Sequence, residues 1–327
     1  MMDQTRPVEK ASSEQEGPYI SVVLPVFSEE EGIKTLIPSI VTALQKMERE
    51  FEIIAVDDGS QDQSLAVLLE LRQDYPEELR VAHHLINRGN GAALRTGIGL
   101  ARGRIIVTLD ADGQHDPEEI PILIKEIPPY DLVIGTRTSI YQGSWYRGLA
   151  NSFYNRFASW LTREEIKDLT SGFRAMRRKA VLHFLPLFPN GFSAPTTTTM
   201  AFLKAGYDVK FIPIDVKPRR SGKSKIHLWR DGVRFIMIIL RMIMLYDPLR
   251  IFLPLGVLSC LLGVATWITG IIFAERLVFP NSTIFLFSTA LTTWLLGLIA
   301  AQISSSRVHS YGDGSVEVYQ DDEVQRD

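Results

Sequence analysis

Cysteine is nearly absent from this chain of 327 residues, in which Cys260 is the single example. One cysteine cannot form an internal disulfide, and it cannot build a zinc site from several thiolates. Excess positive charge is also missing, because the formal net charge is −3. These absences exclude a disulfide framework and redox chemistry between two cysteines, and they predict that the chain binds no nucleic acid.

An apolar run is missing from the N-terminus. Met1–Pro18 is polar and rich in Ser, Glu and Gln, so we expect a disordered tail there and no signal peptide. The C-terminal residues 305–327 are acidic, and we expect them to be disordered as well. The chain as a whole is 46% hydrophobic, which is enough for one large domain and an appendage.

Two carboxylates stand just after the β-branched run Arg104–Thr108, which predicts a buried strand. They are Asp110 and Asp112, and at this spacing both side chains can turn toward one hard cation. The amide oxygen of Gln114 adds a neutral ligand of the kind that Mg²⁺ or Mn²⁺ accepts. We predict a divalent-metal site that bridges a diphosphate. The alternative is a polar loop that caps the next helix, which is the role we expect for Asp116.

Earlier in the chain, the apolar runs 20–26, 51–56 and 80–85 predict further strands, with helical segments between them. Strands that alternate with helices predict an α/β domain with a doubly wound, parallel sheet. Ligands bind beyond the carboxyl ends of the strands in such sheets, and the loops at Glu29, Asp57 and Gly89 fall there. These loops predict a nucleotide site, in which Gly89 and Gly91 would form a close-approach surface beside a diphosphate. As alternatives, Asp57 could merely cap the following helix, and glycines near Gly89 occur in many loops.

Taken in order, the motifs resemble glycosyltransferase family 2, and within it the polyprenyl-phosphate (dolichyl-phosphate) sugar synthases. The resemblance spans roughly residues 20 to 225. It is carried by the segments Leu24–Glu29, Val56–Ser60, Leu109–Pro117, Gly135–Arg137, Asp168–Arg174 and Arg219–Lys225. It implies a GT-A type α/β domain with a doubly wound mixed sheet. It also implies transfer of a sugar from a nucleotide-diphospho-sugar (UDP- or GDP-linked) by a single displacement with inversion at the anomeric carbon.

The chain departs from the family pattern at three places. Ser28 stands where the family often has Asn, and Asn90 stands where it often has Lys. The segment Phe192–Thr199 lacks the acidic residue that many relatives carry there. A lysine contact to the diphosphate is therefore not expected at Asn90, and the acceptor or sugar environment can differ.

The resemblance assigns roles to individual residues. Donor nucleotide binding falls to Pro25, Val26, Glu29, Asp57, Asp58, Gly89, Asp110 and Ala111. Catalysis falls to Asp112, through the metal, and to Asp168 as base or acceptor-orienting group, with a helix cap or turn as the alternative for Asp168. Guanidinium groups grip phosphate bidentately. The cations expected at the acceptor phosphate or the diphosphate are Arg137, Arg174, Arg220, Lys223 and Lys225.

Two apolar runs near the C-terminus, Ile251–Ala274 and Thr283–Ile303, are each long enough to cross a bilayer. Before them, residues 225–248 alternate apolar and arginine positions, which predicts an amphipathic helix at the membrane surface. Arginines gather before the first run and after the second, at Arg230, Arg234, Arg241, Arg250 and Arg307. The positive-inside rule then places the catalytic domain and both termini in the cytoplasm.

We therefore divide the chain into a tail (1–18), a GT-A domain (19–224), an interfacial helix (225–248), a membrane hairpin (249–304) and a second tail (305–327). The expected acceptor is a polyprenyl phosphate, dolichyl or undecaprenyl, at the membrane, and the sequence leaves homo-oligomerisation open. A hydroxyl acceptor is one alternative. A processive polysaccharide synthase usually carries Gln-x-x-Arg-Trp, whose arginine is missing from Gln142–Trp145. A non-catalytic membrane protein would be expected to lose the acids.

Overall fold

The computed structural model describes residues 19–137, 152, 155–156, 158–160, 164–191, 194–216, 237, 240, 243–244, 247–274 and 279–308. The two expected tails fall outside these ranges, except that residues 305–308 continue the last helix. Most of the expected interfacial helix, together with Arg220, Lys223 and Lys225, also lies outside the described residues.

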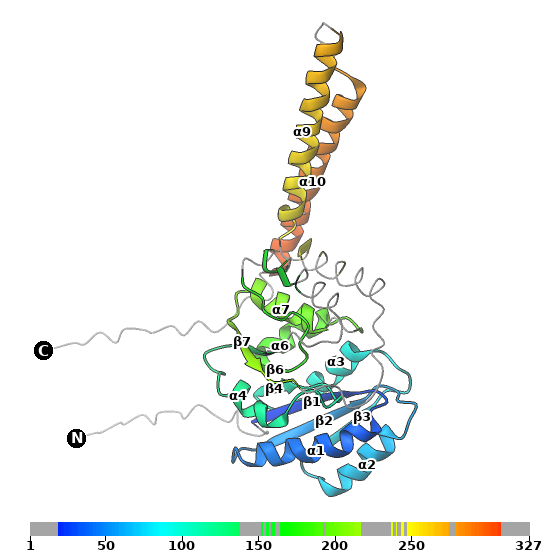
Figure 1. Ribbon diagram of the computed structural model, residues 1–327, viewed down its shortest axis with the longest axis vertical. Helices are drawn as coiled ribbons and strands as arrows, with labels where there is room; N and C mark the ends of the chain where they lie inside the picture. The colour runs from blue at the N-terminus through cyan, green and yellow to red at the C-terminus, as the bar shows by residue number, and fades with distance from the viewer. Residues whose placement is uncertain are drawn as a thin grey trace, which may run out of the picture.

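One seven-stranded sheet organises the domain, in the order β3-β2-β1-β4-β6-β5-β7 (Figure 1). The strands are β1 (Ile20–Val26), β2 (Phe51–Asp57), β3 (Leu79–His83), β4 (Ile105–Thr108), β5 (Leu132–Arg137), β6 (Arg174–Arg177) and β7 (Val209–Ile214). The first four are parallel, as are β5 and β7. The sheet is nevertheless mixed, because β6 runs antiparallel to both β4 and β5. The wholly parallel sheet expected from strand and helix alternation alone is therefore wrong, and the mixed sheet implied by the resemblance is confirmed.

The direction of β6 follows from where it starts. Arg174 pairs with Thr108, the last residue of β4, so β6 begins at the carboxyl end of β4 and runs back along it. The segment 164–173 precedes β6 and therefore lies at the same edge of the sheet as the loop that carries Asp110. This reversal brings the motif around Asp168 to the predicted site.

Helices cover both faces of the sheet. On one face lie α1 (Glu30–Gln45), α2 (Ser64–Asp74), the short 3₁₀ helix η1 (Pro117–Glu119) and α4 (Ile120–Ile124). On the other lie α3 (Asn90–Leu100), α6 (Arg178–Phe184), the 3₁₀ helix η2 (Leu185–Leu187) and α7 (Ala194–Lys204). Because side chains of a strand alternate, Val22 and Leu24 of β1 enter the core under α1 while Val23 enters the core under α3 and α7. Burial on both faces explains why β1 reads as a continuous apolar run.

Two long helices, α9 (Leu249–Ala274) and α10 (Asn281–Val308), form an antiparallel hairpin that projects from the α7 side of the domain (Figure 1). Both are long and apolar enough to cross a membrane. Small residues let them approach closely, because a Cβ at Gly263 would lie 2.9 Å from the ring of Phe287. Most of their other large apolar side chains are exposed, as expected for helices that meet lipid.

Candidate functional site

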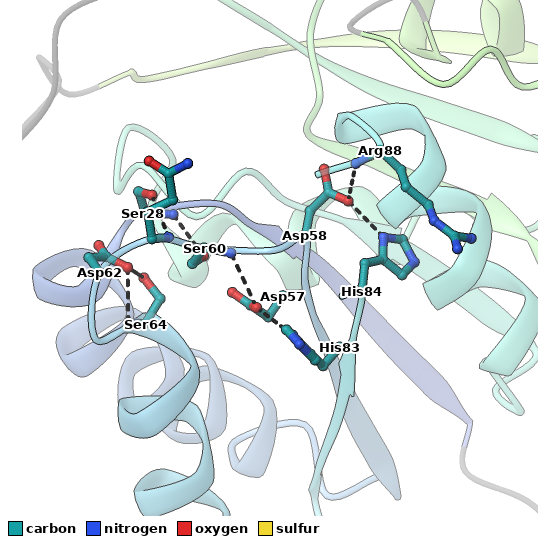
Figure 2. A network of polar contacts seen from close by, with 10 residues as sticks. Ser28, Asp57, Asp58, Ser60, Asp62, Ser64, His83, His84 and Arg88 are labelled. Atoms are coloured by element: carbon teal, nitrogen blue, oxygen red, sulfur yellow. Dashed lines mark hydrogen bonds and ion pairs between the residues drawn. The ribbon is translucent and has the colours of Figure 1, made fainter. Parts of the chain in front are cut away.

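Two buried carboxylates, at the last residue of β2 and the residue after it, face two histidines in the same positions of β3 (Figure 2). Asp57 is 0% exposed and Asp58 is 2% exposed. His83 Nδ1 lies 2.8 Å from Asp57 Oδ2, and His84 Nδ1 lies 2.7 Å from Asp58 Oδ1. Each acid thus has its own imidazole partner. Sequence reasoning missed both histidines, although their position at the end of a predicted strand was a usable signal.

Asp58 organises the loop that precedes α3. Its Oδ1 accepts a hydrogen bond from the backbone N–H of Arg88 (3.0 Å), and its Oδ2 accepts one from Gly89 (2.7 Å). On the far side of the partner imidazole, His84 Nε2 lies 3.0 Å from Thr96 Oγ1. Both carboxylate oxygens are therefore engaged by the protein. Asp58 therefore supports the loop before α3, and its assignment to the donor nucleotide stays a prediction.

Asp57 differs from its neighbour. Its Oδ2 accepts from the backbone N–H of Ser60 at 3.4 Å as well as facing His83. Its Oδ1 is buried and has no hydrogen-bond partner among the residues that the structure describes. A buried acceptor that lacks a donor costs free energy. The geometry leaves Asp57 Oδ1 able to accept an N–H or O–H from a ligand.

The glycines at the start of α3 approach the protein backbone, which corrects the expectation that they form a surface against a diphosphate. Gly91 N donates to Gly191 O at 3.1 Å, and Ala92 N donates to Asn190 O at 3.3 Å. A Cβ at Gly89 would collide with Asn190 O, and the φ of Gly89 is 98°. The first N–H groups of the helix are thus consumed by chain carbonyls, so Gly89 serves loop packing here.

The loop after β1 is tied to the loop after β2. Ser28 N donates to Ser60 Oγ at 2.9 Å, and Glu29 N donates to Ser64 Oγ at 3.0 Å. Ser28 has a φ of 55°, in the left-handed region, where Asn and Gly are more favourable. Both predicted donor residues of the strand itself, Pro25 and Val26, are buried. Glu29, in the loop that follows, is half-buried.

The loop that carries Asp110 and Asp112 is packed from two sides. A Cβ at Gly172 would lie 2.9 Å from Asp110 Cγ, so this glycine makes room for the carboxylate. On the other side, a Cβ at Gly32 would lie 2.8 Å from the carbonyl oxygen of buried Ala111. Both aspartates are half-buried. The loop conformation is therefore fixed by close backbone packing against α1 and the segment before β6.

Gln114 contacts Asp112 through its backbone, since Gln114 N donates to Asp112 Oδ1 at 3.1 Å. Within the described residues, no three His, Cys, Asp or Glu side chains gather closely enough to enclose a metal ion. A cation held by Asp110 and Asp112 would thus take its remaining ligands from water or a substrate. That donor set fits Mg²⁺ or Mn²⁺ bound together with phosphate oxygens. The N-cap role predicted for Asp116 is confirmed, because its side chain accepts from Glu118 N at the start of η1.

A cavity of about 570 Å³ lies between α1 and the outer side of the loop after β4. Its polar lining includes Thr35, Ser39, Asp112, His115 and Asp116. The buried acids that end β2 and the Asp110 carboxylate do not line it. The cavity therefore reaches the predicted metal loop at Asp112 but not the acids at the end of β2.

Asp168 is 4% exposed and caps a turn. Its Oδ1 accepts from Thr170 N, Thr170 Oγ1 and Ser171 N, at 3.0, 3.0 and 3.1 Å. The structure thus shows the turn role that the sequence left open for this residue. Its second assignment, as base or acceptor-orienting group, stays a prediction.

Arg174 does not face an acceptor phosphate, which corrects its assignment. The residue is 2% exposed, and its guanidinium donates to backbone carbonyls of the surrounding loops. Burial lowers the pKa of Arg174 to about 9, although the charges of Asp168 and Asp110 raise it. The group therefore stays protonated at neutral pH. Arg137 ends β5 beside Ile214, and the position of its side chain lies outside what the structure describes.

Two family models match this chain. The model described as glycosyl transferase family 2 matches residues 21–185, which contain β1 to β6 and the candidate site. The model described as the GtrB C-terminal hairpin matches residues 247–306, which contain α9 and most of α10. The two matches thus follow the division between domain and hairpin in the structure.

Among curated relatives, the chain is similar to an undecaprenyl-phosphate 4-deoxy-4-formamido-L-arabinose transferase of Edwardsiella ictaluri. The two are 32% identical over 258 residues, covering 76% of this chain and 74% of the relative. Among solved structures it is similar to glucosyl-3-phosphoglycerate synthase from Mycobacterium tuberculosis. In complex with Mn²⁺, UDP and glucosyl-3-phosphoglycerate, that enzyme gives a TM-score of 0.56 at 22% identity over 69% of this chain and 80% of the other. With Mg²⁺ and UDP the score is 0.55 at 23% identity, over 69% and 79%. These structures establish a shared fold.

Proposed function

This chain belongs to glycosyltransferase family 2, and we propose that it moves a sugar from a nucleotide-diphospho-sugar to a polyprenyl phosphate at a membrane surface. The name of the Edwardsiella relative supports the acceptor class, because it specifies undecaprenyl phosphate. The matched C-terminal hairpin supports the membrane location, because its helices are apolar and long enough to span a bilayer.

The observation that carries this proposal is the packing of the hairpin base on the site-bearing layer. Ile243 is buried in the core that contains α6 and α7, and Ile251 of α9 packs against the same core. Lys204, at the end of α7, lies 3.9 Å from Asp247 across this junction. The guanidinium of Arg250 lies 4.9 Å from the ring centre of Trp160. Helix α7 lies between the sheet and the hairpin (Figure 1), so the catalytic domain is held close to any lipid that the hairpin meets.

On the donor side, we assign nucleoside recognition to Asp57 and metal binding to Asp110 and Asp112, with Gln114 beside them. The buried, unpartnered Oδ1 of Asp57 suits an N–H of uracil or guanine or a ribose hydroxyl. Mg²⁺ or Mn²⁺ would supply positive charge that stabilises the leaving nucleoside diphosphate. The metal-bound UDP complexes of the mycobacterial enzyme support this assignment by analogy of fold.

On the acceptor side, an oxygen of the lipid phosphate attacks the anomeric carbon while the bond from that carbon to the diphosphate breaks. A phosphate is already anionic near neutral pH, so it needs orientation more than it needs a strong base. We assign this orientation to Asp168 and to the cations Arg137, Arg220, Lys223 and Lys225. The arginine distribution around the hairpin supports a cytoplasmic catalytic domain with both termini on the same side.

The test uses the full-length protein in lipid bilayers with a panel of radiolabelled UDP- and GDP-sugars and Mn²⁺. Each donor is offered with polyprenyl phosphate or with the matched polyprenol, and the label that enters the organic phase is counted. We expect transfer to the phosphate from one donor and none to the alcohol. Equal labelling of the polyprenol would establish a hydroxyl acceptor instead. An Asp112→Asn variant, which keeps the side-chain shape, controls for metal-independent background.

A further inference from the structure

Arg174 is the largest fully buried side chain in the described part of the protein. In β6 it pairs with Thr108 of β4 on one side and with Ile134 of β5 on the other. Two residues beyond Thr108 along the chain stands Asp110, and three beyond Ile134 stands Arg137. The backbone of Arg174 therefore lies in the sheet between the strand that leads to the metal loop and the strand that leads to a candidate acceptor cation.

The guanidinium of Arg174 ties two further segments together. Nε donates to Ser171 O at 2.6 Å and Nη2 donates to Leu169 O at 3.3 Å, both in the turn that Asp168 caps. Nη1 donates to Pro195 O at 2.6 Å and to Thr199 Oγ1 at 2.9 Å, both in the first turns of α7. One planar side chain thus fixes the Asp168 turn against α7, which shares a core with Ile251 at the base of the hairpin.

Stability alone does not account for a charge in this position. Taking a cation out of water costs several kcal/mol, and well-packed apolar residues often replace buried ionic groups without loss of stability. The charges that act on Arg174 are those of Asp168 and Asp110, the candidate acceptor-orienting group and a candidate metal ligand. Geometry connects Arg174 to the same carboxylate, because its Nε donates to Ser171 O and the next residue, Gly172, packs closely against Asp110.

We propose that Arg174 is a positioning residue for sugar transfer, which holds the Asp168 turn, the start of α7 and the Asp110 carboxylate in one fixed arrangement without contacting a substrate. This inference rests on the proposed function for the identity of the reaction. Arg174 would act on the reaction through its neighbours. This role differs from the direct contact with a phosphate that the resemblance implied.

The test compares Arg174→Lys with the matched variant Arg178→Lys in the full-length protein. Lysine keeps the positive charge but cannot reach all four acceptors. Arg178 is a suitable control because its Nε also donates to a backbone carbonyl, that of Ala101 at 2.8 Å, away from the site. For Arg174→Lys we expect a fall in kcat of about 10- to 100-fold and a higher Mn²⁺ concentration at half-maximal rate, as for other residues that orient metal ligands. For Arg178→Lys we expect neither.

A titration of the acceptor, polyprenyl phosphate, distinguishes this positioning role from direct binding of the acceptor by Arg174. We expect the KM for polyprenyl phosphate to stay within about twofold, because no contact to the acceptor is removed. A rise confined to that KM, with kcat and the Mn²⁺ requirement unchanged, would overturn the inference and restore Arg174 as a phosphate ligand. A lower Tm with all kinetic constants unchanged would overturn it too, because the residue would then serve folding alone.

Thr199→Val keeps the inference testable if Arg174→Lys fails to fold. It removes one acceptor of the guanidinium in a nearly isosteric change, and we expect a smaller fall in kcat with the same rise in the Mn²⁺ requirement. Where both variants fold, the double variant should lose no more than Arg174→Lys alone, because the shared hydrogen bond is already gone. Full additivity, or an unchanged Thr199→Val enzyme, would contradict the proposed arrangement.

A binding measurement separates this inference from the proposed function. Calorimetry with UDP or GDP and Mn²⁺, in the absence of any acceptor, reports on the Asp110 site alone. If the unmodified protein glycosylates no polyprenyl phosphate, the proposed function fails. Weaker Mn²⁺-dependent nucleotide binding by Arg174→Lys would still support the positioning role, and equal binding by the two proteins would refute it.

Discussion

Gly172→Ala places a single methyl group against the Asp110 carboxylate. The new Cβ would lie 2.9 Å from Asp110 Cγ and 3.1 Å from Oδ1, and closer still to Oδ2, whereas ordinary contacts begin at 3.4 Å. The backbone of Gly172 cannot retreat easily, because its carbonyl oxygen accepts a hydrogen bond from Thr108 Oγ1 at 2.7 Å. The carboxylate is therefore the group that must move.

The size of that movement sets the expected effect. Restoring an ordinary contact at Cγ alone requires 3.4 − 2.9 = 0.5 Å. Metal–ligand distances tolerate only about ±0.2 Å, and disturbing the residues that orient a ligand costs about 10- to 100-fold in metal affinity or activity. That range corresponds to about 1.4–2.8 kcal/mol. We expect the Mn²⁺ concentration at half-maximal transfer to rise by this factor.

The assay is a Mn²⁺ titration of sugar transfer, with Tm measured on the same samples. Gly99→Ala is the matched control, because its Cβ would lie 3.8 Å from Leu185 Cδ2, an ordinary contact, and Gly99 is the next-to-last residue of α3. An unchanged Mn²⁺ titration in Gly172→Ala, with a Tm near that of the unmodified protein, would show that Asp110 is not a metal ligand in this arrangement.

Three further predictions concern stability and the donor loops. Ser28→Asn should raise the free energy of unfolding by about 0.5–1 kcal/mol, and with it Tm, because asparagine tolerates the positive φ of 55°. A lower Tm would contradict this. His84→Leu should cost about 1–3 kcal/mol and raise the donor KM more than the acceptor KM, since it leaves buried Asp58 without its imidazole; equal rises in both would refute it. Burial raises the pKa of Glu52, but hydrogen bonds from Ser21, Arg102 N and Arg80 outweigh it and lower that pKa. The associated stability is present above the unfolded pKa of about 4.3 and is lost as pH falls through the lower folded pKa. Glu52→Gln should therefore flatten the acid side of a Tm-against-pH curve, and an unchanged curve would exclude this contribution.

Periodicity predicted most of the elements, because each depends on residues close together in the chain. β1, β2 and β4 lie where β-branched runs predicted them, and both hairpin helices contain the predicted apolar runs. The direction of β6 could not be derived from periodicity in the same way. It depends on where a loop returns to the sheet, and Arg174 reaches its partner Thr108 across a separation of more than sixty residues.

The glycine-rich start of α3 shows why a correct motif can still be misinterpreted. The sequence indicated that some group approaches the backbone closely at Gly89 and Gly91, and the structure shows such an approach. The group is the backbone of Pro189–Gly191, which lies about a hundred positions further along the chain. Glycine signals an absent Cβ, and it carries no information about whether ligand or protein fills the space.

Arg174 and Asp58 illustrate the same limit for charged residues. A sequence gives the charge of a side chain but not its burial, and the resemblance had assigned both residues to substrates. In the structure, carbonyls and a hydroxyl satisfy the donors of Arg174, and backbone N–H groups with His84 satisfy Asp58. Asp110 and Asp112, by contrast, are half-buried, and their loop is held in place by close packing against Gly172 and Gly32.

The hydrogen bonds between protein groups at this edge of the sheet connect several loops of the site in series. Asp58 fixes the loop before α3, that loop receives Pro189–Gly191, and the segment then enters α7, whose first turns accept the guanidinium of Arg174. Arg174 in turn fixes the Asp168 turn. Together these links connect a donor-side loop with an acceptor-side segment. A site that must align a nucleotide with a phosphate arriving from a membrane gains from such rigid connection, because a displacement of about 1 Å in a reacting group can cost about a hundredfold in rate.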